Sequence, residues 1–135
     1  MEQLPHFGGQ QGVEVNTSAS KFLDLTRGVS AQLSTLRGDL PEVMRAFSEL
    51  ARAATRDGAL DRKTKELIAL ALGVAARCDA CIGFHVQSLA SLGVTKKELE
   101  ETLAMAVYMG GGPSLMYSAN AMAAFDEFAV TARAA

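Results

Sequence analysis

An uninterrupted apolar run from Leu67 to Ala76 is the feature that most constrains how this chain can fold. The run is too short to span a bilayer, so we interpret it as part of one helix inside the protein. We expect that helix from about Arg62 to Arg77, with Asp61 as its N-terminal cap. A helix that is apolar nearly all round must be covered on most of its sides. The remainder of the chain must therefore supply that cover.

Helical periodicity and helix-end residues recur on both sides of this run. Hydrophobic residues make up 49% of the 135 residues but aromatic residues only 6%, which favours packed helices over a β-sandwich. We predict an all-α bundle of about six helices, forming a single domain over residues 18–135 after a flexible leader over residues 1–17. The other expected helices are Ser18 or Ser20 to Gly38, Pro41 to Asp57 with Asp39 as its cap, Cys78 or Asp79 to Gly93, one opened by the Thr95–Glu98 capping box and ended by Gly110–Pro113, and Ser114 to Ala132.

Charge and the first residues exclude several classes of protein. The formal net charge is −2 and no basic stripe is present, so neither nucleic acid nor an anionic membrane is an expected partner. The N-terminal sequence has neither the basic start nor the apolar core of a secretory signal. We therefore expect a cytoplasmic setting, where a close cysteine pair is more often catalytic or metal-binding than a structural staple.

Both cysteines and one of the two histidines fall in the next expected helix. Cys78, Cys81 and His85 stand at i, i+3 and i+7, which places them on one helix face. The cysteines can close a disulfide with little backbone movement, and the helix N-terminus favours a thiolate at Cys78. His85 can exchange a proton with Cys81, and Glu66 could orient the imidazole if the two helices pack antiparallel. We take Arg77 and Asp79, beside the thiols, as surface charges.

Other uses of a Cys-x-x-Cys pair fit this sequence less well. Haem attachment requires a histidine directly after the second cysteine, where Ile82 stands. Structural zinc requires four ligands, and no second Cys or His pair is available. A thioredoxin fold would place the motif after a strand. We expect no metal and no cofactor.

The spacing of these residues resembles that of the AhpD-like (alkylhydroperoxidase D) branch of the carboxymuconolactone decarboxylase superfamily. The pattern is Glu66, eleven residues, Cys78-x-x-Cys81, three residues and His85, followed by the Gly110–Pro113 break. The resemblance covers roughly residues 40–128, and its specific part is the Glu/Cys/Cys/His spacing. It implies an all-α fold and assembly as a homo-oligomer, either a hexamer built as a trimer of dimers or a trimer.

The resemblance also implies roles for the four residues. The relay acid of the family corresponds to Glu66, its paired thiols to Cys78 and Cys81, and its relay histidine to His85. Family behaviour makes Cys81 the attacking thiolate and Cys78 the resolving one, whereas the helix N-terminus favours Cys78 as the stabilised thiolate. Well-characterised members carry another histidine just before the second cysteine, where this chain has Ala80.

The resulting hypothesis is a thiol-disulfide oxidoreductase with peroxidase activity, for which the missing histidine at Ala80 removes one member of the proton relay. Its substrate would be a peroxide or a disulfide, and by resemblance its redox partner a dihydrolipoyl protein or a peroxiredoxin. True carboxymuconolactone decarboxylases lack the cysteine pair. Two alternatives stay open: a cofactor-free decarboxylase or isomerase of a small acid or lactone that uses Glu66 and His85, and a non-catalytic oligomer.

Overall fold

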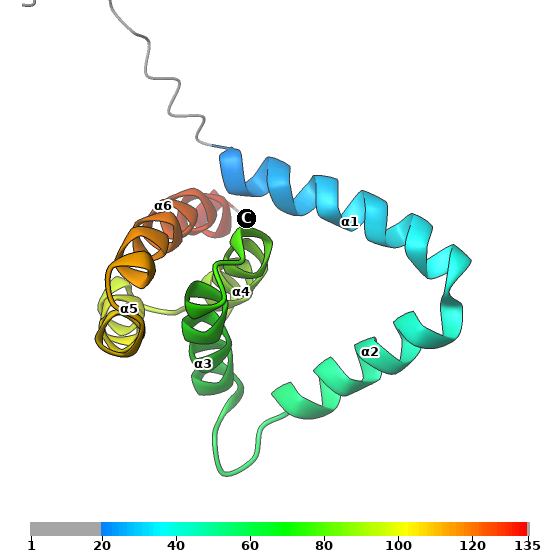
Figure 1. The fold of residues 1–135 in the computed structure, drawn as a ribbon, viewed down its shortest axis with the longest axis horizontal. Helices are drawn as coiled ribbons and strands as arrows, with labels where there is room; N and C mark the ends of the chain where they lie inside the picture. Colours follow the sequence, from blue (N-terminus) through cyan, green and yellow to red (C-terminus); the bar gives the residue numbers. More distant parts are fainter. Residues whose placement is uncertain (1–19, 135) are drawn as a thin grey trace, which may run out of the picture.

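The computed structural model describes residues 20–134, and every regular element in that part of the chain is an α-helix (Figure 1). The prediction of an all-α fold with about six helices is confirmed. The leader predicted over residues 1–17 lies outside the described residues. The helices are α1 (Lys21–Asp39), α2 (Pro41–Thr55), α3 (Arg62–Ala75), α4 (Asp79–Ser91), α5 (Lys96–Gly110) and α6 (Gly112–Ala134).

Local hydrogen bonds define most of the helix ends. The Asp61 carboxylate accepts a hydrogen bond from the Thr64 amide at 2.7 Å and so caps α3 as predicted. Thr95 and Glu98 form the predicted capping box at the start of α5. The cap predicted for α2 is wrong, because Asp39 is the last residue of α1 and Leu40 alone connects the two helices. Pro41 therefore starts α2 without a side-chain cap.

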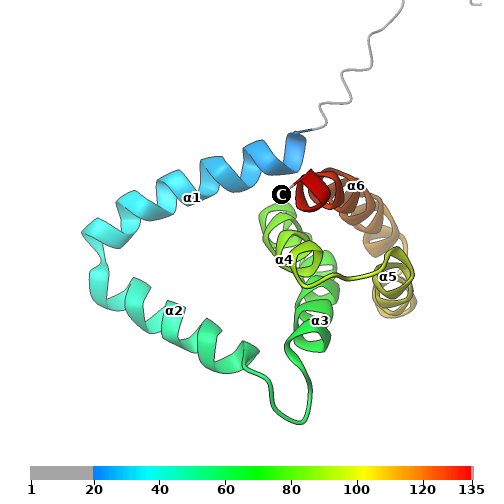
Figure 2. The same cartoon turned by 180° about the vertical axis from the view of Figure 1, so that it is seen from behind.

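The hydrophobic core lies among α3, α4, α5 and α6, which pack against one another away from α2 (Figures 1 and 2). The apolar run predicted to be buried contributes Leu70 and Val74, both fully buried. As expected, α3 is covered on most of its sides, and one side is left open, where Ile68 is 45% and Leu72 65% exposed. None of the helices described is long and apolar enough to cross a membrane.

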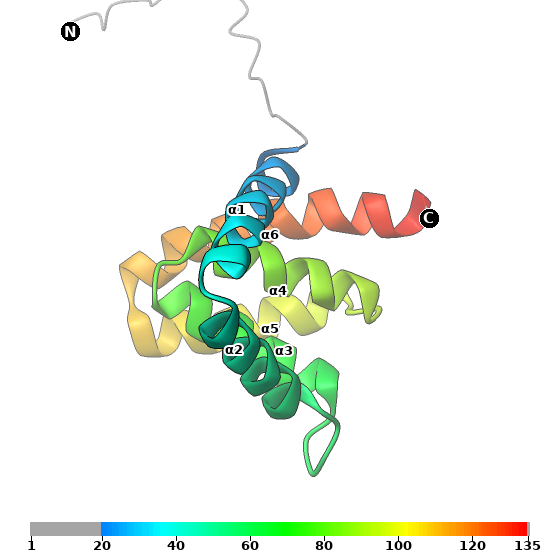
Figure 3. The same cartoon turned by 90° about the vertical axis from the view of Figure 1, so that its right-hand side faces the viewer.

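The N-terminal end of α1 is attached to this core, and α2 is not. Phe22 is 1% exposed, and its backbone amide donates to the Glu127 carboxylate of α6 at 2.9 Å. Thr26 packs on Gly83 of α4, where a Cβ would lie 2.8 Å from the threonine methyl carbon. Beyond this anchor the chain leaves the core, and α2 contains no buried residue. In Figure 3, α1 and α2 lie in front of the other helices and descend from beside α6 towards the loop that leads into α3.

Candidate active site

The turn between α3 and α4 sets the position of the first cysteine. The Cys78 amide donates to the carbonyl of Gly73 at 3.0 Å, and the Arg77 amide donates to that of Val74 at 3.1 Å. These two bonds form a Schellman motif that ends α3, with Arg77 at φ 57° in the left-handed position where glycine is usual. This turn ends α3 at Ala75, two residues before the predicted end, and makes Cys78 the N-cap of α4.

The two cysteines are joined by a disulfide. Their sulfurs lie 2.11 Å apart and their Cα atoms 5.2 Å apart. The Cys81 backbone amide also donates to the Cys78 sulfur at 3.2 Å, as expected for an N-cap side chain. The same amide can stabilise a Cys78 thiolate when the disulfide is reduced, because a donor near an anion favours the charged form.

Gly73 allows α3 to approach the cysteine pair closely. A Cβ on this residue would lie 3.2 Å from the Cβ of Cys81, closer than ordinary side-chain contacts. No role was expected for Gly73 from the sequence, although it is the only glycine within the apolar run. Its position inside a helix could have indicated a close helix contact, since an interior glycine otherwise costs stability.

Glu66 and His85 meet across the α3–α4 interface. Oε2 of Glu66 lies 2.6 Å from Nδ1 of His85. The contact of Gly73 with Cys81 lies further along the same interface, so the two helices run antiparallel, which is the arrangement that the sequence analysis required for this pair. Glu66 is 4% exposed, and the imidazole provides its buried carboxylate with a hydrogen-bond partner.

The second imidazole nitrogen of His85 faces solvent. Nε2 has no hydrogen-bond partner among residues 20–134. Every buried side-chain nitrogen and oxygen in that range has a partner, so Nε2 is not buried. The His85 side chain is 33% exposed. A proton on Nδ1, donated to Glu66, leaves the lone pair on Nε2 free for proton transfer. His85 stands one turn after Cys81 on α4, as the predicted spacing requires.

The neighbours of the thiols differ from expectation in one respect. Asp79 is partly buried, and its carboxylate accepts a hydrogen bond from Asn120 of α6 at 3.0 Å. It therefore holds the first turn of α4 against α6, and its assignment as a surface charge is wrong. Arg77 is exposed, as predicted. Ala80, directly before Cys81, has no side-chain group that could carry a proton.

A cavity of about 500 Å³ adjoins the Glu66–His85 pair, between α2 and the start of α3. Three arginines, for which no functional role was expected from the sequence, form much of its wall. No local sequence pattern could have identified them, because their convergence depends on where α2 lies relative to α3. The charged and titratable residues that line the cavity are Arg52, Arg56, Asp57, Arg62, Glu66 and His85.

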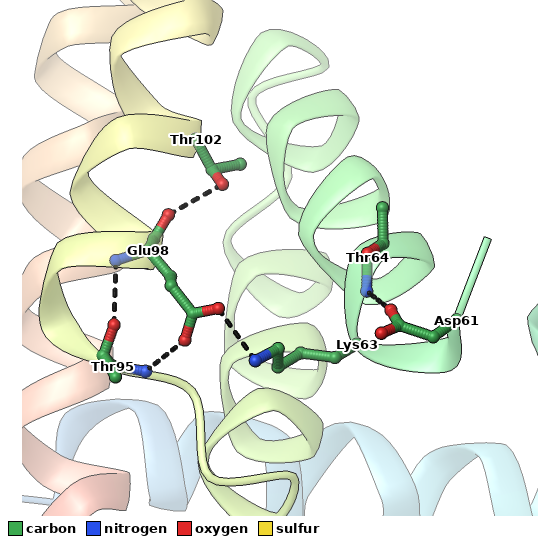
Figure 4. Close-up of polar contacts among 6 residues, drawn as sticks. All are labelled: Asp61, Lys63, Thr64, Thr95, Glu98 and Thr102. Atoms are coloured by element: carbon green, nitrogen blue, oxygen red, sulfur yellow. Dashed lines mark hydrogen bonds and ion pairs between the residues drawn. The ribbon is translucent and has the colours of Figure 1, made fainter.

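Polar contacts fix the first turn of α3, next to Glu66 (Figure 4). Lys63 and Glu98 form an ion pair of 2.8 Å between α3 and α5. This pair lowers the pKa of the Glu98 carboxyl below its ordinary value and raises the pKa of the Lys63 amine. The hydrogen bond from Thr64 lowers the pKa of Asp61. The first turn of α3 is therefore held by charged groups at neutral pH.

Comparison with known proteins gives consistent results for sequence and structure. The sequence profile of the "Carboxymuconolactone decarboxylase family" matches residues 41–124. An uncharacterized protein of Cupriavidus necator is 42% identical over 98 residues, which are 73% of this chain and 87% of that protein. A crystal structure of a carboxymuconolactone decarboxylase family protein from Legionella pneumophila is 60% identical, with a TM-score of 0.81, over 82% of this chain and 98% of that one.

A crystal structure from Thermotoga maritima is also similar, with 31% identity and a TM-score of 0.68 over 84% of this chain and 94% of that one. It is described as a carboxymuconolactone decarboxylase family protein for which involvement in an antioxidative response has been suggested.

Proposed function

The chain belongs to the carboxymuconolactone decarboxylase family, and on that premise we propose that it is an AhpD-like thiol-disulfide oxidoreductase with peroxidase activity. The observation that carries this proposal is the Cys78–Cys81 disulfide at the start of α4, one turn before a histidine bonded to a buried glutamate. The suggested antioxidative role of the Thermotoga maritima relative supports the same chemistry.

In the oxidative half of the cycle, the reduced pair loses two electrons to a peroxide. Nε2 of His85 accepts the proton of the Cys81 thiol, and the Cys81 thiolate attacks one oxygen of the O–O bond. That bond breaks, the departing alkoxide takes a proton from the imidazolium, and Cys81 becomes a sulfenic acid. The Cys78 thiolate then attacks the Cys81 sulfur and displaces hydroxide, which leaves as water after protonation. One peroxide is reduced to an alcohol and water for each disulfide formed.

The geometry at the helix start suits Cys78 to the resolving role. Its sulfur accepts the Cys81 amide, so a thiolate at Cys78 is stabilised both as a nucleophile in this step and as a leaving group when the disulfide is reduced. This assignment reconciles the two expectations from the sequence, because the stabilised thiolate and the attacking thiolate are different residues.

An external dithiol completes the cycle by thiol-disulfide exchange. The redox partner we assign is a dihydrolipoyl protein, whose dithiol can supply these electrons, or a peroxiredoxin, whose disulfide would instead take electrons from the reduced pair. The setting we assign is cytoplasmic, where thiols are kept reduced. The methyl side chain of Ala80 cannot carry a proton, so His85 and Glu66 must carry out the proton transfers without a further histidine.

A mass and rate experiment tests this function. Fully reduced protein is mixed in a stopped-flow instrument with one equivalent of an organic hydroperoxide, and separately with oxidised lipoamide, and its intact mass is then measured. We expect rapid loss of two thiols and of two hydrogen masses, mapped to Cys78 and Cys81, and no turnover in Cys81→Ser. Thiols that stay reduced towards both reagents would refute the proposal and leave Glu66 and His85 as candidates for chemistry on a small acid.

We also propose that the protein is a homo-oligomer, most simply the hexamer, built as a trimer of dimers, that the family resemblance implies, with a trimer as the smaller alternative. The supporting observation is that α2 exposes its apolar side chains. Val43, Phe47 and Leu50 are 62%, 65% and 64% exposed, although they follow one another along one face of the helix. A contiguous apolar face of this kind marks an interaction surface.

A further inference from the structure

The cavity beside Glu66 and His85 is lined by more positively charged than negatively charged side chains. Arg52 and Arg56 of α2 and Arg62 of α3 all line it. None of these three guanidinium groups forms an ion pair within the part of the chain that the structure describes. Because like charges repel at short range, an anion placed among them would lower the free energy of this arrangement.

The two carboxylates of the cavity are already engaged elsewhere. Oδ1 of Asp57 accepts a hydrogen bond from the backbone amide of Arg62 at 2.7 Å, and Glu66 is bonded to His85. Three guanidinium groups therefore face two carboxylates, one of which is already paired with an imidazole. The cavity is left with an excess of positive charge and with free guanidinium donors.

The loop between α2 and α3 fixes the backbone positions of Arg56 and Arg62. Nζ of Lys65 donates to the carbonyl oxygen of Arg56 at 2.5 Å, and the Asp57–Arg62 bond closes the same loop from the other side. Both bonds fold the end of α2 back onto the first turn of α3. Arg56 and Arg62, which are separated by this loop in the sequence, are thereby brought to the wall of one cavity.

We propose that this cavity binds a small organic molecule through a carboxylate held by Arg52, Arg56 and Arg62, with the other end of the molecule facing His85. A volume of about 500 Å³ suits a small molecule. Guanidinium groups bind carboxylates with paired, charge-assisted hydrogen bonds. This inference rests on the proposed function in one respect: it assigns the peroxide or disulfide substrate to the carboxylate-bearing class.

The position of His85 connects the anion site to the thiols. His85 lines the cavity and lies one turn after Cys81 on α4. A molecule held by its carboxylate at the arginines can therefore place its peroxide or disulfide group beside His85, one turn from Cys81. The arginines act by positioning the substrate, so their loss should raise KM more than it lowers kcat.

Binding is tested first with a pair of probes that undergo no redox reaction. Pentanoate and pentanamide differ only in the charged group, and each is titrated into the full-length disulfide form by calorimetry. We expect pentanoate to bind and pentanamide to bind at least tenfold more weakly. Arg52→Gln combined with Arg56→Gln should weaken pentanoate roughly tenfold, since charge-assisted hydrogen bonds are lost. Arg45→Gln, on the same helix but outside this cavity, should leave the affinity unchanged.

Reactivity is then compared with lipoate and lipoamide, which carry the same disulfide but differ in the carboxylate. We expect the reduced protein to react faster with lipoate, and the double arginine variant to lose that preference while keeping its rate with lipoamide. Equal pentanoate affinity in the wild type and the double variant would overturn the inference, whatever the thiols do. Arginine-dependent pentanoate binding with thiols inert to every oxidant would instead uphold the anion site and refute the redox function.

Discussion

The bond between Glu66 and Nδ1 of His85 determines which part of the imidazole can take part in chemistry. With Nδ1 directed at the carboxylate over 2.6 Å, only Nε2 is available to exchange a proton with a thiol or a leaving group. A buried glutamate that bonds an imidazole in this way fixes the orientation of the ring and leaves Nε2 as the nitrogen that can exchange a proton. The contribution of His85 should therefore appear in the pH dependence of thiol oxidation.

Replacing His85 with glutamine should slow peroxide-driven thiol oxidation roughly 100-fold near neutral pH, because the general base is lost. The deficit should shrink above about pH 8.5, where a thiol ionises without help. Stopped-flow thiol loss across pH 6–10 measures both effects. Gln87→Ala, an exposed position on the same helix, serves as the control. A deficit that is equal at every pH would contradict the base role and indicate a structural one.

At the scale of helices, one glycine determines how closely α1 and α4 can pack. Gly83 is buried where the methyl group of Thr26 approaches, and a Cβ there would lie 2.8 Å from it. This contact and the bonds from the Phe22 amide to Glu127 attach the start of α1 to the core. The direction in which α1 and α2 extend therefore depends on a small number of side chains.

Gly83→Ala should lower the free energy of unfolding by about 1–3 kcal/mol, because the added methyl group overpacks the α1–α4 contact. Gly28→Ala is the matched control. No atom lies within 4 Å of a Cβ at that position, and alanine favours a helix interior, so this variant should gain about 0.5–1 kcal/mol. Urea denaturation of both variants measures the difference. A stabilising Gly83→Ala would show that α1 does not pack on α4 in this way.

The Lys63–Glu98 pair links α3 to α5, and its effect on stability depends on pH. The folded-state pKa of Glu98 lies below its ordinary value of 4.5, so its stabilising contribution is complete above that pH and is lost as the pH falls through the folded value. The pKa of Lys63 is raised above 10.5, so its contribution is complete below that pH and is lost as the pH rises through the folded value.

Glu98→Gln should therefore lower stability at pH 7 and make little difference once the pH is well below 4.5, where the wild-type carboxyl is protonated as well. Thermal melting from pH 3 to pH 8 follows this change. Glu101→Gln on the same helix forms no such pair and should show no comparable dependence. A deficit that persists unchanged at pH 3 would mean that the capping geometry, rather than the charge, is the main contribution of Glu98.

At the scale of the whole molecule, the sequence predicted those features that depend on neighbours along the chain. The caps at Asp61 and Thr95 bond residues three positions away, so their sequence pattern suffices to locate helix ends. The Cys78, Cys81 and His85 registry depends only on one helix. The Glu66 contact was predicted under the condition of antiparallel packing, because it depends on two helices joined by a short turn.

Features that depend on distant segments could not be predicted. The convergence of Arg52, Arg56 and Arg62 requires the position of α2 relative to α3. An interior glycine such as Gly73 indicates a close helix contact but not that its partner is Cys81. The partner of the apolar face of α2 could not be predicted either. A periodic apolar stripe indicates that a helix face is covered, but not whether the same chain or another chain covers it. In this chain Arg52 lines the cavity beside α3, and Ser48 lines a second cavity together with Arg37 of α1, whereas Val43, Phe47 and Leu50 are left exposed.

The exposed apolar face of α2 leads to a prediction about assembly. Phe47 is at the centre of the exposed stripe, between Val43 and Leu50, and an aspartate there would place a charge inside any interface formed by this face. Phe47→Asp should therefore shift the protein to a smaller oligomer or a monomer. Ser48→Asp, at a position that lines the cavity beside Arg37 and not the apolar face, should not. Light scattering coupled to size-exclusion chromatography measures the masses. A wild type that is monomeric at micromolar concentration, or a Phe47→Asp variant of unchanged mass, would show that another copy of the chain does not cover α2.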